Sequence, residues 1–146
     1  MLSSNLIHLI EDHFEQITAD HLLRVQKDPE LPHIKKLPAS ELRNWARHIL
    51  RHLGDWLAAS SEKEVASCYQ GLGRLRFEES VPLHESVRNF QNLKQLIVDY
   101  VRSRAVHETT LQIYAEEELE HLLCRFFDSM VYHVVRGYET ARREVA

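Results

Sequence analysis

Glycine, proline and cysteine are all scarce in this sequence. Its 146 residues include only 4 Gly, 4 Pro and 2 Cys, which leaves little material for the tight turns of an all-β fold or for a glycine-rich phosphate loop. The sequence also contains no Gly-x-Ser-x-Gly motif and no Cys or Ser with a convincing base. These absences predict an all-α protein that is not an enzyme. Cys68 and Cys124, which form no C-x-x-C pair, are expected to be reduced thiols.

Excess positive charge and long apolar runs are missing as well. The formal net charge is −4, so no overall positive field attracts nucleic acid. The apolar runs are far shorter than the roughly 20 residues that cross a bilayer, and the N-terminus lacks an export signal. With 44% hydrophobic residues, the chain is expected to form a single cytoplasmic domain over residues 1–146 that binds neither membrane nor nucleic acid.

Apolar residues recur at helical spacing in five segments. The predicted helices cover residues 4–26, 40–57, 61–80, 83–107 and 110–144, and a proline-bearing connector separates the first two. Ser61 and Glu64 have the spacing of a capping box at the start of the third helix, and Pro82 forces a tight corner before the fourth. The sequence therefore predicts a five-helix bundle with a long C-terminal helix.

The last predicted helix is apolar over more than one stripe of its circumference. We expect one compact bundle to leave part of this surface uncovered, so that a second subunit contacts this helix, alone or together with the fourth, in a homodimer. The candidate interface residues share the apolar side of the helix: Leu119, Leu123, Phe126, Phe127, Met130 and Val134.

Histidine is unusually frequent, with 10 residues. Helical phase places His21 and His133 on the apolar sides of the first and last helices, which predicts that both are buried. Two interpretations stay open. Each is a core histidine with one polar partner, or each senses a proton or metal, because burial makes the protonation of an imidazole depend on conformation.

A second pair, His48 and His52, has the i,i+4 spacing of a metal clamp. The zinc-peptidase pattern requires Glu directly after the first His, where this chain has Ile49. The two residues alternate with arginines, which is typical of a solvated basic helix face. They are metal candidates by spacing alone, and no metal site or resident cofactor is predicted.

Arg76 shares a face of the third helix with apolar residues. A buried guanidinium requires a carboxylate partner, which is either Glu79, three residues on, or a group from another helix. Alternatively, the arginine stem lies over the core while its head reaches water. We assign Arg76, Glu79 and Pro82 to a structural corner.

The segment 69–90 contains a small residue at Gly73 and two basic residues at Arg74 and Arg76. The corner Val81-Pro82-Leu83 follows them, ahead of an apolar helix. With the Trp-bearing helix before it and the long helix after it, this segment resembles the N-terminal sensor domain of the RsbT co-antagonist (RsbRD) type, over about Leu6 to Tyr138.

The resemblance implies a non-catalytic, dimeric signal-input domain of bacterial stress-response proteins, whose last helix leads into an output kinase or another signalling module. It also implies a globin-like arrangement, because related input domains look like globins that have lost haem. Since no output domain follows, the chain is either an excised sensor region or a stand-alone member. The alternative function is a haem- or metal-binding sensor or carrier that uses a buried histidine, and a third is a purely structural adaptor.

Overall fold

The computed structural model describes residues 1–58, 62–104 and 106–146. Within these ranges every regular element is helical, as predicted, and no strand is formed. The helices are α1 (Ser4–Asp12), α2 (Phe14–Lys27), the 3-10 helix η1 (Ile34–Lys36), α3 (Ala39–Arg51), α4 (Leu53–Leu57), α5 (Glu62–Glu78), α6 (Leu83–Arg104) and α7 (Thr110–Glu144). None of the described helices combines the length and apolar character that a membrane span requires.

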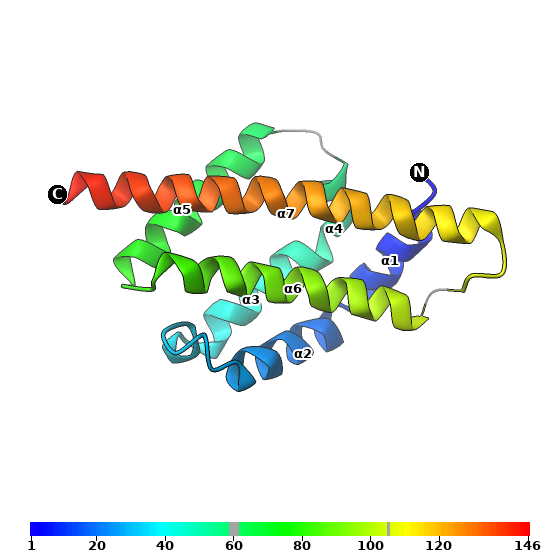
Figure 1. The fold of residues 1–146 in the computed structure, drawn as a ribbon, viewed down its shortest axis with the longest axis horizontal. Coiled ribbons are helices and arrows are strands. Elements are labelled where there is room, and N and C mark those ends of the chain that lie inside the picture. The colour runs from blue at the N-terminus through cyan, green and yellow to red at the C-terminus, as the bar shows by residue number, and fades with distance from the viewer. Residues whose placement is uncertain (59–61, 105) are drawn as a thin grey trace.

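The two longest helices, α6 and α7, run antiparallel along the molecule, as Figure 1 shows. Helix α5 crosses α7 on one side, and α6 packs against α7 on another. Helices α2 and α3 pack against each other, and α2 also contacts α6. Helix α7 therefore touches several neighbours within one chain, and its C-terminus lies at one end of the molecule (Figure 1).

Two of the five predicted helices are each broken in two, which corrects the helix count. The first breaks at His13 (φ −110°, ψ 25°) and the second at His52 (φ −120°, ψ 28°). The broken pieces pair off, because α1 packs on α4 and α2 packs on α3. The two breaks are adjacent, since the Arg51 guanidinium at the end of α3 lies 5.3 Å from the Phe14 ring centroid at the start of α2. Neither break contains Pro, and at the second one the Gly54 N–H donates to the Glu11 carboxylate of α1 at 2.9 Å instead of continuing the helix of α3.

The corner between α5 and α6 forms as predicted. Ser80 takes a left-handed conformation (φ 59°), and the Val81 N–H donates to the Arg76 carbonyl at 2.9 Å, which closes a Schellman-type turn. Pro82 then precedes the first residue of α6. The capping pattern predicted at Ser61 lies outside the described residues.

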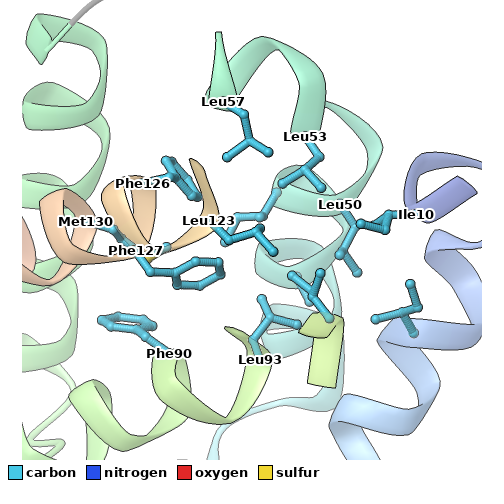
Figure 2. Packing of buried hydrophobic residues seen from close by; sticks show 14 of the residues in the cluster. Ile10, Leu50, Leu53, Leu57, Phe90, Leu93, Leu123, Phe126, Phe127 and Met130 are labelled. Carbon is cyan, nitrogen blue, oxygen red and sulfur yellow. The ribbon is translucent and has the colours of Figure 1, made fainter. Parts of the chain in front are cut away.

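A single apolar cluster unites most helices, as Figure 2 shows with Phe90 and Leu93 of α6 near Leu123 and Phe127 of α7. A smaller cluster fastens the proline-bearing connector to the bundle, through Val25, Leu31, Ile34, Leu42 and Val81. These two clusters hold the helices that carry the candidate site.

The burial of α7 corrects the predicted subunit interface. All six predicted interface side chains lie inside the chain's own core and are at most 5% exposed: Leu119, Leu123, Phe126, Phe127, Met130 and Val134. The wide apolar surface of α7 arises because α5, α6, α1 and α4 all pack against it. A second copy that contacts α7 in this packing must therefore use the other face of the helix.

Helices α5 and α7 approach each other closely enough for their backbones to touch. A Cβ atom added to Gly73 would lie 2.1 Å from the Val134 carbonyl oxygen, and one added to Gly137 would lie 2.0 Å from the Gln70 carbonyl oxygen. Only glycine fits at both positions, because even one methyl group would overlap backbone atoms that have no rotamer to change.

Candidate functional site

His133 links α7 to α5 through both of its ring nitrogens. Its side chain is buried, as predicted, and its Nδ1 atom lies 3.1 Å from the Gln70 amide nitrogen. The amide donates, so Nδ1 accepts and the ring proton resides on Nε2, which donates to the Glu62 carboxylate at 3.1 Å. Gln70 is also the residue whose backbone touches Gly137. Any movement of α5 against α7 therefore changes the contacts of His133.

A cavity of about 350 Å³ opens beside this contact, between α4, the start of α5 and the middle of α7. Apolar side chains line part of it, including Trp56, Leu57 and Phe126, and Glu62 is among its polar residues. The Trp56 and Phe126 ring centroids are 5.5 Å apart. The polar link between α5 and α7 therefore adjoins a partly aromatic cavity.

Arg76 is fully buried and links α5 to α3 and to the turn that follows α5. Its Nη1 atom donates to Glu79 at 2.7 Å and to Glu41 of α3 at 2.9 Å, so both predicted types of partner are present. Burial and then the contact with Glu41 raise the pKa of Glu79, which Arg76 opposes. The corner is held to α7 as well, because the Tyr138 hydroxyl donates to the Val81 carbonyl at 2.8 Å.

His21 lies in a polar cluster at the interface of α2, α3 and α6. Its side chain is buried, as predicted, and Nε2 lies 3.0 Å from the Asn89 side-chain oxygen. Burial lowers the pKa of His21 to about 4, so the ring is neutral at pH 7. Five buried polar atoms here have no hydrogen-bond partner among the described residues, on Thr18, His21, Trp45, Ser86 and Asn89. Such atoms are costly in a packed interior.

The model of the family "RsbT co-antagonist protein rsbRD N-terminal domain", RsbRD_N, matches residues 15–146. The match covers most of the chain. The chain belongs to the RsbRD_N family. No curated protein and no solved structure gives a significant match.

The RsbRD_N match begins within α2 and continues through α7 to the C-terminus. It therefore includes the α5–α7 contact, the Arg76 corner and the His133 link, and it leaves out α1. RsbRD_N is a family of regulatory signalling domains, which generally have no catalytic activity. The resemblance predicted from residues 69–90 is thus confirmed at the level of the family.

Two buried carboxylates of this RsbRD_N domain were not predicted from the sequence. Glu85 at the start of α6 accepts backbone N–H bonds from His33 at 2.8 Å and Ile34 at 3.2 Å. Asp28 accepts from Arg88 at 2.7 Å, and that contact is the main reason why the pKa of Asp28 falls to about 2. Both carboxylates fasten the proline-bearing connector to α6. For Asp28 a local signal was available, because an Asp directly before Pro29 is placed to accept a nearby backbone N–H, and here it accepts that of Glu30 at 3.0 Å; Glu85 is too distant in sequence from its partners to give one.

His48 and His52 lie close together, with ring centroids 6.0 Å apart. Burial, followed by the proximity of His52, lowers the pKa of His48. Among the residues that the structure describes, no group of three or more His, Cys, Asp or Glu side chains is arranged to hold a metal ion. This pair therefore gains no further ligand from the fold.

Proposed function

We propose that this RsbRD_N domain is a non-catalytic signal-input module that dimerises and passes a conformational change along α7 to an output kinase or another signalling partner. The observation that carries the proposal is the α5–α7 contact at Gly73 and Gly137, where two helical backbones touch. Close-packed interfaces of this kind switch between discrete arrangements rather than deforming gradually. Because α7 is one helix of 35 residues, a shift at this contact is carried to its C-terminal end.

The relay requires a stimulus that prefers one of two packings of the bundle. The His133 link is the part of the contact that a stimulus can reach, because its acceptor Glu62 has a side chain that is 79% exposed. A stimulus that competes for Glu62 removes one bond between α5 and α7. The bond from His133 to Glu62 is therefore the proposed point of entry for the signal.

The proposed dimer contact is the outer face of the C-terminal half of α7. Tyr132 is 58% exposed there. It borders a shallow groove whose other lining includes Val135, Arg136, Glu139 and Arg143. Arg136 and Glu139 have opposite charges on neighbouring turns, so a second copy offers each of them a complementary partner. An exposed tyrosine framed by charged side chains matches the composition of many protein interfaces.

Light scattering tests the dimer. The wild-type chain is expected to have twice the 17.2 kDa mass of one chain, and Tyr132→Glu is expected to give the single-chain mass. Tyr114→Glu is the matched control, because Tyr114 is also exposed on α7 but lies near its other end. A wild-type monomer, or a dimer that Tyr132→Glu leaves intact, contradicts the proposed interface.

The proposed relay works without a resident haem or metal. Visible absorbance and elemental analysis of the freshly purified chain test this point. Colour or stoichiometric metal that disappears in His21→Ala or His133→Ala would favour the haem- or metal-binding alternative.

A further inference from the structure

The cavity between α4, α5 and α7 combines an aromatic surface with a negatively charged rim. Trp56 and Phe126 both line it. Tyr69 contacts both of these rings, with centroids 5.5 Å from Trp56 and 6.0 Å from Phe126. Tyr69 is buried behind the other two rings, and only Trp56 and Phe126 reach the cavity, where aromatic rings attract a cation placed over their faces.

The polar residues that line this cavity carry an excess of negative charge. Four carboxylates, on Asp55, Glu62, Glu64 and Asp128, stand against one guanidinium, on Arg125, which gives the lining a formal net charge of −3. The carboxylates come from all three helical segments, so the fold brings together charges that are distant in sequence. A field of this sign concentrates cations and repels anions.

The volume of about 350 Å³ is near the lower end of the range for small-molecule sites, which indicates a small ligand. A bare metal ion does not match the aromatic surface, and among the described residues no metal-binding group of side chains is present. An organic ammonium ion matches both features, because its alkyl groups pack on the rings while its charge faces the carboxylates.

We propose that this cavity binds a small organic ammonium ion and is the signal-binding site of the domain. This inference rests on the proposed function, because it supplies the stimulus that the relay requires. Glu62 connects the two, since it lines the cavity and also accepts the hydrogen bond from His133. A bound cation competes with His133 for the Glu62 carboxylate and so weakens one link between α5 and α7.

Three probes of nearly the same shape separate charge from size. They are choline, the neutral alcohol in which carbon replaces its quaternary nitrogen, and the carboxylate with the same tert-butyl group. Calorimetric titration of the full chain is expected to give at least tenfold tighter binding for choline than for either analogue. Equal or tighter binding of the alcohol or the carboxylate, or no saturable binding of choline, overturns the proposal.

Variants locate the site. Asp55→Asn combined with Asp128→Asn is expected to weaken choline binding at least tenfold, because it removes two rim charges. Glu15→Gln combined with Asp20→Asn is the matched control, since both are exposed acids on α2, away from the cavity lining. Equal loss in both double variants, or no loss in the first, contradicts the assignment.

The two indole N–H signals of the chain report the location independently by NMR. Choline is expected to shift the Trp56 signal and leave that of Trp45, which lies beside His21, in place. A shift of Trp45 alone overturns the assignment.

The two proposals fail separately. If the chain binds choline but stays monomeric, the dimer is refuted and the ligand site stands. If the chain forms a Tyr132-dependent dimer but does not bind choline, the ligand site is refuted and the dimer stands.

Discussion

Replacing Gly73 by alanine tests the close α5–α7 contact. An added Cβ would lie 2.1 Å from the Val134 carbonyl oxygen, whereas ordinary contact begins at 3.4 Å, so the helices must separate by about 1.3 Å. Overpacking typically costs about 1–3 kcal/mol, and the upper end applies here because the obstacle is backbone. Alanine has a more favourable helix propensity than glycine by about 1 kcal/mol. The net loss in the free energy of unfolding is therefore about 2 kcal/mol.

Gly71→Ala is the control, because it is the same change two residues away on α5. Gly71 is exposed and nothing lies within 4 Å of an added Cβ. This variant is expected to gain up to about 1 kcal/mol from helix propensity alone. Urea unfolding followed by circular dichroism measures both, and with a slope of roughly 2 kcal/mol per molar, Gly73→Ala lowers the midpoint by about 1 M. If both variants stabilise the chain equally, the backbone contact described here is absent.

Three further changes probe other parts of the fold. Because the pKa of His21 is about 4 when folded and 6.5 when free, the unfolded chain binds more protons between these values. The free energy of unfolding therefore falls by roughly 3 kcal/mol in total as the pH drops from 6.5 to 4. Urea titrations at several pH values are expected to show a shallower fall for His21→Gln than for the wild type. An identical pH profile for the two chains refutes this. Arg76→Ala leaves two partly buried carboxylates without their cation and is expected to lower the free energy of unfolding by roughly 3–5 kcal/mol. The control Arg74→Ala removes an exposed ion pair with Glu144 and is expected to have little effect. Similar losses for both variants in thermal unfolding contradict a buried role for Arg76. Ser80→Gly relieves a left-handed serine and is expected to add about 1 kcal/mol, so a lower melting temperature for this variant disproves the turn geometry.

Helical periodicity accounts for what the sequence predicts well. The phase of each apolar stripe placed His21 and His133 in the interior, and both are buried. The same reasoning left two interpretations for Arg76, and the one with a carboxylate partner is confirmed, because the side chain is buried and two carboxylates accept from it. These predictions succeed because burial on one helix face depends on local spacing, which the sequence displays directly.

Features that depend on partners distant in the chain could not be read in this way. The bends at His13 and His52 contain no Pro, and they lie where α1 packs on α4 and α2 packs on α3. The apolar excess of α7 was predicted to face a second chain, yet helices of the same chain cover it. Periodicity measures how much surface must be buried, but it does not identify what buries it.

The contact at Gly137 was also missed, although a signal was available. Glycine inside a long helix costs about 1 kcal/mol relative to alanine and therefore needs a reason in packing. Gly73 is part of the family resemblance, and Gly137 lies inside the longest predicted helix. Taken together, the two glycines would have predicted a close crossing of α5 and α7.

In the proposed relay, α7 changes position when its link to α5 is released. Spin labels at Arg142→Cys, an exposed position in the last turn of α7 outside the groove lining, in a chain whose Cys68 and Cys124 are replaced by serine, report the distance between the two α7 ends in the dimer. Glu62→Ala removes the His133 bond, and Glu78→Ala is the control at an exposed carboxylate of the same helix. Since one hydrogen bond contributes about 1 kcal/mol, roughly a fivefold change in populations, the distance distribution is predicted to shift for Glu62→Ala alone. Identical distributions in the wild type and both variants would contradict the relay.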